Sequence, residues 1–293
     1  MSSFTDRIHS FGRAMLERHG ERVHKVALDA GFTCPNRDGS KGIGGCTFCN
    51  NKSFAPGARD PVPLAAQFER ARGRIARGTG ARRFIAYFQA YTNTYAHVDE
   101  LRALYDTALA APDVIGLSIG TRPDCVPPPV LDLLAEYRDR GHGFAEYEAA
   151  TRAARARGIP VCCHLIVGLP GEDASHSHAS LDRVLEVGVD GLKLHPLHVV
   201  KHTRLAIEWK RGEYAPLAEA DYLRIAADLI ERTPWQVVYH RVTGTAAPDM
   251  LLAPAWCAKK WDVLNGIADE LARRDSRQGA RAGQIWKENS HAA

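Results

Sequence analysis

Short apolar runs alternate with longer amphipathic segments along most of this chain. Runs of strand length, rich in β-branched and aromatic residues, occupy residues 23–28, 84–88, 114–119, 161–167, 191–194 and 235–239. Segments with helical spacing lie between them, at residues 64–77, 98–111, 128–140, 180–187 and 217–232. Strands separated by helices indicate βαβ units and a parallel sheet. We therefore expect an α/β fold, a full or partial (β/α) barrel rather than a doubly wound sheet.

The alternation is interrupted at one point and extended at both ends. The helical segment 128–140 runs through Gly141 into a second helical segment, 144–157, with no strand between them. Amphipathic patterns at the two ends, 4–19 and 255–273, add helices to the core. The predicted organisation is a single domain, 1–293, with a leading helix at 1–22, a barrel core at 23–240 and a C-terminal extension at 241–293.

Composition narrows the class of protein without naming a function. Hydrophobic residues make up 45% of the chain and charged residues 25%, and the formal net charge is +4. These values are ordinary for a soluble globular protein, and no apolar run approaches the ~18 residues of a membrane helix. The polar start, MSSFTDRIHS, lacks the pattern of a secretory signal. We expect a cytoplasmic protein with no membrane partner, whose seven cysteines are metal ligands or buried thiols rather than disulfides.

The stretch richest in candidate chemistry is GFTCPNRDGSKGIGGCTFCNN, directly after the first predicted strand. Cys34, Cys46 and Cys49 are spaced C-x11-C-x2-C within it. Two cysteines separated by two residues can face the same metal or cluster edge, and nearby glycines leave backbone N–H groups for the sulfurs. Three thiolates suit an iron–sulfur cubane with one open iron. A structural zinc with a fourth ligand such as His24, and three buried thiols, are the alternatives.

Several long segments, this one included, resemble the YhcC-like radical S-adenosylmethionine (SAM) proteins, a group related to the elongator catalytic subunit. The matching segments are GFTCPNRDGSKGIGGCTFCNN, FIAYFQAYTNTYA, LSIGTRPDCVP, HLIVGLPGED, GLKLHPLHVVK and HRVTGTAAPDMLLAPAWCAKKWDVLN. The resemblance implies a partial (β/α) barrel of the radical SAM type that binds a [4Fe–4S] cluster and SAM. It further implies an enzyme that cleaves SAM reductively and starts radical chemistry on a substrate, with electrons from a flavodoxin- or ferredoxin-type reductant.

Carried onto this chain, the resemblance makes Cys34, Cys46 and Cys49 the cluster ligands. The implied SAM contacts lie at the ends of predicted strands or after them: Gln89, Tyr91, Thr92, Ser118, Thr121, Arg122, Gly168, His195 and Leu197. Structural roles are the alternative for several of them. Arg122 could simply pair with Asp124, and His195 could be a structural histidine. No catalytic residue is assigned.

The chain departs from the family at Gly141, where relatives carry a further strand rich in Glu, Gly, Leu and Gln. The absent piece corresponds to about one βα unit. Its strand would supply hydrogen-bonding partners to both neighbours, so catalytic competence depends on how its loss is accommodated. The alternative function is a catalytically impaired iron–sulfur or zinc protein that acts through a partner. A tRNA substrate is suggested by kinship with the elongator group and by the mild positive charge.

Overall fold

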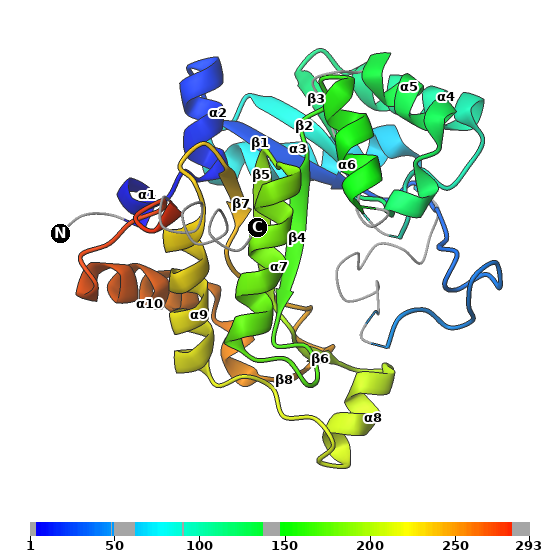
Figure 1. Ribbon diagram of the computed structural model, residues 1–293. Coiled ribbons are helices and arrows are strands. Elements are labelled where there is room, and N and C mark those ends of the chain that lie inside the picture. The colour runs from blue at the N-terminus through cyan, green and yellow to red at the C-terminus, as the bar shows by residue number, and fades with distance from the viewer. Residues whose placement is uncertain (1–3, 48, 50–61, 90, 137–146, 283–293) are drawn as a thin grey trace. The chain divides into compact units, whose positions relative to one another are not determined.

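The computed structural model describes residues 4–47, 49, 62–89, 91–136 and 147–282 (Figure 1). It divides into two compact units. One, here the cysteine unit, comprises residues 15–162, and the other, here the C-terminal unit, combines residues 1–14 with residues 163–293. The predicted junction at Gly141 lies outside the described residues.

The cysteine unit is built on a three-stranded parallel sheet in the order β1-β2-β3. Its strands are Val23–Leu28 (β1), Arg83–Phe88 (β2) and Val114–Ile119 (β3). Burial alternates along them, because successive side chains of a strand point to opposite faces. Val26, Ala86 and Leu117 are buried on one face. The other face carries the half-buried side chains of Lys25, Tyr87 and Ser118, which are polar.

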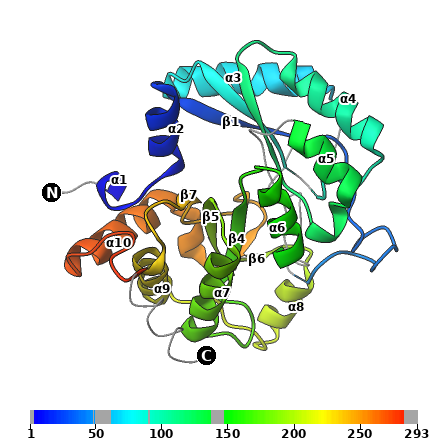
Figure 2. The ribbon, with the colours of Figure 1, turned by 45° about the horizontal axis from the view of Figure 1, so that its top comes forward.

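Helices cover the apolar face of this sheet, as Figure 2 shows for α3 and α4. Phe68 of α3 packs edge-on against Phe84 of β2 at 6.0 Å, and Tyr105 of α4 packs against Phe88 at 5.3 Å. The helical elements of the unit are α3 (Leu64–Thr79), α4 (Val98–Leu109), η2 (Pro123–Cys125), α5 (Pro128–Glu136) and α6 (Tyr147–Ala156).

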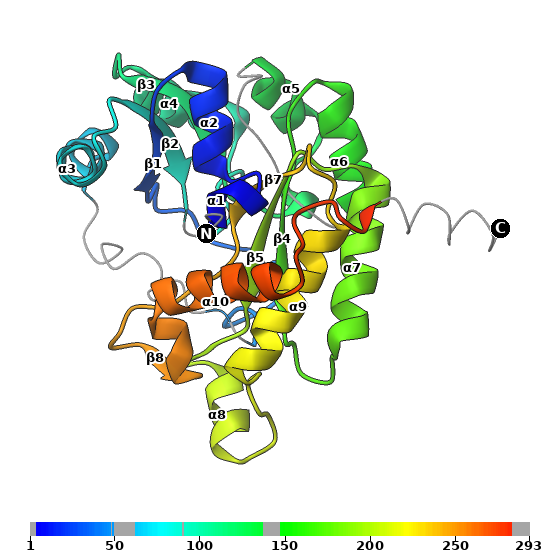
Figure 3. The same cartoon turned by 90° about the vertical axis from the view of Figure 1, so that its left-hand side faces the viewer.

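The C-terminal unit holds a second sheet in the order β4-β5-β7, with β5 and β7 parallel. Its strands are β4 (Cys162–Val167), β5 (Gly191–Pro196) and β7 (Val238–Arg241), and β6 (Val199–Val200) and β8 (Leu251–Ala253) form an antiparallel pair. Figure 3 shows α9 and α10 side by side. The helical elements of this unit are α1 (Phe4–Arg7), α7 (Ala174–Val187), α8 (Arg204–Lys210), α9 (Glu219–Arg232), η3 (Ala255–Ala258) and α10 (Lys260–Arg273). Helix α2 (Phe11–His19) crosses from this unit into the cysteine unit.

The start of the chain is part of the C-terminal unit. Ser10 forms a parallel bridge to Tyr239 of β7, whose N–H donates to the carbonyl of His9 at 2.8 Å. The His9 ring stacks on Trp235 with the centroids 5.5 Å apart. The predicted single leading helix is therefore wrong in detail, because this bridge separates α1 from α2.

The α/β class with parallel sheets is confirmed, and most strands lie where the apolar runs predicted. The last strand is displaced. Residues 235–237 were predicted to begin it, but Val237 N–H donates to Pro234 O in a turn, and β7 begins only at Val238. Helix α7 begins six residues before the predicted start, because Asp173 caps it by accepting from the N–H groups of Ser175 and His176. No described helix is long and apolar enough to cross a membrane.

Candidate functional site

The three clustered cysteines lie on a loop that leaves β1, and hydrogen-bonded turns shape both ends of it. The carbonyl of Cys34 accepts the N–H groups of Arg37 at 2.8 Å and of Asp38 at 3.3 Å. The carbonyl of Cys46 accepts the N–H of Cys49 at 3.0 Å. None of the three cysteines forms a disulfide. The spacing C-x2-C thus forms a turn here, as the sequence predicted.

Polar neighbours surround these thiols. The Asn36 amide Nδ2 donates to Cys46 Sγ at 3.2 Å. Burial raises the pKa of the Cys49 thiol, and the nearby Cys46 and Cys34 raise it further, whereas Arg37 opposes them. A cationic group beside the thiols, with an amide donor, would stabilise thiolates if they ligated a metal centre.

Gly45 allows the loop to close around Arg37. Its φ is +97°, and a Cβ there would lie 2.7 Å from Arg37 Nη1. The Arg37 guanidinium lies over the Tyr91 ring, 5.6 Å from its centroid. Tyr91 itself has φ +59°, which is uncommon for a residue with a side chain. The loop and the segment after β2 therefore contact each other through Arg37 and Tyr91.

Two further contacts join the loop to the segment after β2. The N–H of Thr92 donates to the carbonyl of Thr33 at 3.2 Å, and Ser40 Oγ lies 2.8 Å from the Tyr95 hydroxyl. Asn93, fully buried in this segment, donates through Nδ2 to Gly120 O at 2.8 Å. These contacts hold the cysteine loop and the ends of β2 and β3 together.

An ion-pair cluster anchors the loop to the segment after β3. Lys41 Nζ lies 2.6 Å from Asp124 Oδ2, and Arg122 donates to both oxygens of the same carboxylate at 2.9 and 2.7 Å. Arg122, and then Lys41, hold the pKa of the Asp124 carboxyl well below its usual range. The guanidinium of Arg122, an implied SAM contact, is thus engaged in a bidentate pair within the protein.

The other implied SAM contacts of the cysteine unit lie at the ends of its strands. Gln89 donates its N–H to Leu28 O at 3.0 Å, which continues the β1–β2 pairing. Ser118 Oγ accepts from Lys25 Nζ at 3.5 Å. The hydroxyls of Thr121 and Thr94 share a hydrogen bond. These side chains and backbone groups cluster on the same edge of the sheet as the cysteine loop.

Three implied SAM contacts belong to the C-terminal unit. Gly168 follows β4 with φ +90°, and a Cβ there would lie 2.8 Å from Leu217 Cδ1. Packing and backbone conformation alone therefore require glycine at this position. Leu197 is buried and donates its N–H to Val167 O at 2.8 Å. His195, at the end of β5, stacks on His164 with the ring centroids 5.4 Å apart.

The three thiols of the loop fit the ligand chemistry of an iron–sulfur cluster. Among the described residues, no group of three His, Cys, Asp or Glu side chains is placed to hold one metal ion. His24, the suggested fourth zinc ligand, is exposed, and its Nδ1 lies 3.3 Å from Lys25 O. An iron–sulfur cubane needs only thiolates and is held by cysteines alone.

Sequence reasoning missed the residues that anchor the loop. Lys41, Tyr95 and Arg37 lie within the segments that resemble the family, but no role was predicted for them. Asp124 could have been found, because an acidic residue two positions after Arg122 is well placed to pair with it, and that pairing was considered as the alternative for Arg122.

Comparisons with known proteins assign the family. The radical SAM C-terminal domain matches residues 189–273. Protein YhcC of Escherichia coli (strain K12) is 43% identical over 302 residues, covering 95% of this chain and 96% of YhcC. The chain belongs to the YhcC-like radical SAM proteins. Protein YtqA of Bacillus subtilis (strain 168) is also similar to this YhcC-like protein, 37% identical over 303 residues, which covers 95% of this chain and 94% of YtqA.

More distant similarities connect this YhcC-like protein to the elongator group. A tRNA uridine(34) acetyltransferase of Methanocaldococcus jannaschii is 32% identical over 95 residues, covering 31% of this chain and 18% of that enzyme. The structure of Methanocaldococcus infernus Elp3 lacking its N-terminus superposes with a TM-score of 0.59 at 14% identity. The match covers 87% of this chain and 64% of that one, and it shows likeness of fold alone.

Proposed function

We propose that this YhcC-like protein is an iron–sulfur enzyme that cleaves SAM reductively, and that Cys34, Cys46 and Cys49 hold its [4Fe–4S] cluster. The observation that carries the proposal is the anchored cysteine loop. Three cysteines outside any disulfide lie on one loop, which is tied to the ends of β2 and β3 by backbone hydrogen bonds and by the Lys41–Asp124 ion pair. When bound, the cluster supplies the electron that cleaves SAM.

Residues of the loop would keep the thiolates in place and stabilise their charge. Asn36 donates to Cys46 Sγ, and the Arg37 guanidinium is close enough to oppose the rise in the Cys49 pKa. Hydrogen bonds and charges around cysteine ligands tune a metal centre in this way.

The SAM contacts that the family resemblance implies remain proposals for this chain. We propose Gln89, Tyr91, Thr92, Ser118 and Thr121 in the cysteine unit, and Gly168, His195 and Leu197 in the C-terminal unit. Arg122 already donates two hydrogen bonds to Asp124. For Arg122 the contacts therefore favour a positioning role: it fixes the carboxylate that Lys41 of the cysteine loop binds.

We further propose that the fold is a partial barrel lacking one βα unit. The alignments to YhcC and YtqA, at 302 and 303 positions, are longer than this 293-residue chain, although they cover only 95% of it. These alignments therefore contain gaps in this chain. A gap at the predicted junction near Gly141 would explain the two consecutive helical segments.

The substrate is proposed to be RNA-related, and the electron donor a flavodoxin- or ferredoxin-type protein. Similarity to tRNA uridine(34) acetyltransferases supports the first proposal, although it spans only about a third of this chain. The alternative, a catalytically impaired iron–sulfur or zinc protein acting through a partner, is favoured if the absent βα unit is needed for SAM binding.

Anaerobic reconstitution with iron and sulfide, followed by EPR of the reduced protein with and without SAM, tests the proposal. A cluster signal that changes on adding SAM is expected. A cluster signal indifferent to SAM would favour the impaired protein, and stoichiometric zinc without a cluster would contradict the proposal. Cys46→Ala should abolish the signal, whereas Cys162→Ala, which removes a half-buried thiol outside the loop, should retain it.

A further inference from the structure

The sheet β4-β5-β7 carries a concentration of basic side chains. The three strands read CCHLIV, GLKLHP and VYHR, and none contains Asp or Glu. Side chains on β5 alternate between faces. Leu192 and Leu194 are fully buried on one face, so Lys193 and His195 lie on the other. Because the His164 ring stacks on His195, β4 adds a second imidazole to the face of Lys193.

A bulge in β7 adds an arginine to this face. Leu192 pairs with Tyr239, but Lys193 pairs with Arg241, so His240 is an extra residue between the two pairs. Residues directly opposite each other in a sheet share a face, and a bulge re-aims the side chains that follow it. Without the extra residue, Arg241 would lie on the leucine face. The register shift thus places two cationic side chains opposite each other.

Like charges opposite each other on neighbouring strands are destabilising. Lys193 is 6% exposed and Arg241 is exposed, so water screens the repulsion mainly from the side of the arginine. A protein can tolerate such a pair at a site that receives an anion, where cationic and hydrogen-bonding groups converge.

His195 is held beside these cations as a neutral ring. Burial, and then the charges of Arg241 and Lys193, lower the pKa of His195 to about 3. A neutral imidazole has one N–H donor, and His195 Nε2 has no hydrogen-bond partner among the described residues. Gly244 lies against the other nitrogen, since a Cβ there would be 2.8 Å from His195 Nδ1. The close approach of Gly244 fixes the position of the ring.

We propose that Lys193, Arg241 and His195 form a binding site for an oxyanion, a phosphate or carboxylate group. The two cations supply the attraction and His195 supplies a hydrogen bond. The site deepens the proposed function, on which its role rests, because the oxyanion belongs either to an anionic substrate or to the carboxylate of SAM.

A phosphorus NMR titration of the full chain with inorganic phosphate tests the site directly. Arg241→Gln, which removes an exposed side chain, should weaken binding about tenfold, as should Lys193→Met. The single control variants Lys259→Met and Arg211→Gln each remove one positive charge from an exposed position of the C-terminal unit and should bind like the unmodified chain. Absence of phosphate binding, or equal weakening in the controls, would overturn the proposal.

Gly244→Ala tests whether the positioned His195 ring contributes to phosphate binding, as distinct from the positive charge of the site. It leaves the net charge unchanged but forces His195 to move, so phosphate should bind more weakly. Binding that is unchanged in this variant would exclude His195 from the site.

S-adenosylhomocysteine distinguishes the two sources of the oxyanion, because it carries the carboxylate of SAM. Competition with phosphate assigns the site to SAM, and independent binding assigns it to the substrate. Phosphate binding requires no cluster, so the titration is done on the protein both before and after reconstitution. Phosphate binding without any SAM cleavage would defeat the proposed function alone, and SAM cleavage without phosphate binding would defeat the site alone.

Discussion

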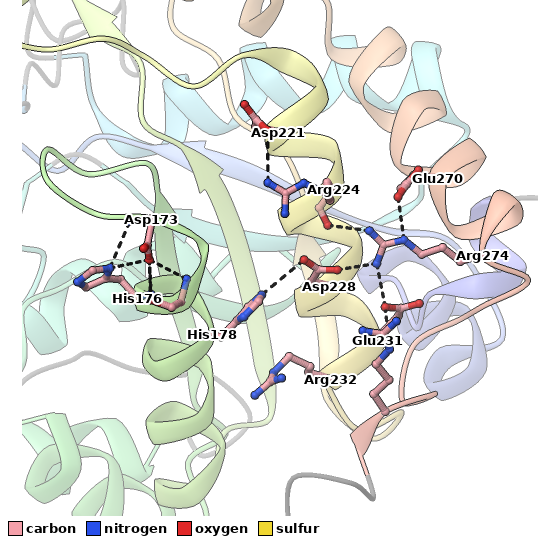
Figure 4. Close-up of polar contacts among 12 residues, drawn as sticks. Asp173, His176, His178, Asp221, Arg224, Asp228, Glu231, Arg232, Glu270 and Arg274 are labelled. Atoms are coloured by element: carbon pink, nitrogen blue, oxygen red, sulfur yellow. Dashed lines mark hydrogen bonds and ion pairs between the residues drawn. The ribbon is translucent and has the colours of Figure 1, made fainter.

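Arg274, directly after α10, reaches the buried carboxylate of Glu231 on α9, with Nη1 2.9 Å from Oε2 (Figure 4). The same guanidinium contacts Asp228 at 2.6 Å and Glu270 at 2.8 Å. Glu231 is only 1% exposed, so its charge depends on this partner and on Arg281, 3.3 Å away. Arg274 therefore joins α9 to α10 through charges that are poorly solvated.

Arg274→Met should destabilise the protein by about 3 kcal/mol, because removing one partner leaves Glu231 buried with weaker compensation. The neighbouring Arg273→Met is the matched control. Arg273 pairs with Glu270 at 2.7 Å, but its side chain is 70% exposed, so its loss should cost less than about 1 kcal/mol. Urea unfolding followed by tryptophan fluorescence measures both. Equal losses for the two variants would show that the buried Arg274–Glu231 pair contributes no more to stability than the exposed Arg273–Glu270 pair.

Glu270 should make stability depend on pH in the acid range. Hydrogen bonds from Arg273 and then Arg274 lower the pKa of Glu270 to about 2, from an ordinary value near 4.5. A lowered folded-state pKa contributes stability above pH 4.5, and this contribution is lost as the pH falls toward 2. Glu270→Gln should remove about 1–2 kcal/mol at neutral pH and flatten the stability curve between pH 4.5 and 2. If stability fell equally steeply over this pH range in Glu270→Gln and in the unmodified protein, Glu270 would not be the group responsible.

The cysteine loop should loosen when its anchor is removed. Asp124→Asn weakens contacts to both Lys41 and Arg122, whereas Lys41→Met removes a single pair whose lysine is 54% exposed. We expect the loop thiols to be alkylated by iodoacetamide several-fold faster in Asp124→Asn than in Lys41→Met, since one exposed pair contributes about 1 kcal/mol or less. Lys260→Met, in the C-terminal unit, is the control and should alkylate at the original rate. Unchanged rates in Asp124→Asn would show that the loop is held by its backbone contacts alone.

Gly168→Ala should destabilise the C-terminal unit through two separable effects. Its φ of +90° strains any residue with a side chain, and its Cβ would lie 2.8 Å from Leu217 Cδ1. Gly171→Ala is the matched control, because Gly171 has φ +80° but nothing within 4 Å of its Cβ. We expect a loss of about 1–2 kcal/mol in the control and about 1 kcal/mol more in Gly168→Ala, measured by thermal unfolding. Leu217→Ala added to Gly168→Ala should recover part of that difference, and a failure to recover would exclude the clash.

Much of the fold could be predicted because strand and helix patterns are local. The runs at 23–28 and 114–119 become β1 and β3 with the predicted ends. The displaced β7 shows the limit of such reasoning. Residues 235–237 are apolar enough for a strand, but the turn at Pro234 and the bridge from Ser10 decide where pairing begins.

In the candidate site, too, local features could be predicted and long-range contacts could not. The cysteine turn could be predicted from spacing, since it involves neighbours in the sequence. Its anchor could not, because Lys41 and Asp124 are 83 residues apart and meet only when the sheet has formed. The bulge at His240 could not be predicted either, because the register of a strand pair depends on both strands, here β5 and β7. Hence the position of Arg241 beside Lys193 could not be read from either strand alone.

The division of the chain between its two units has a consequence for the order of folding. Residues 15–162 form one unit from a continuous stretch, so its sheet can assemble as soon as that stretch has left the ribosome. Residues 4–14 are synthesised before that stretch but belong with β7, and Ser10 can meet Tyr239 only after residue 239 has been made. The segment around Ser10 therefore reaches its final place late although it is made early, and the unit that carries the cysteine loop can fold before that happens.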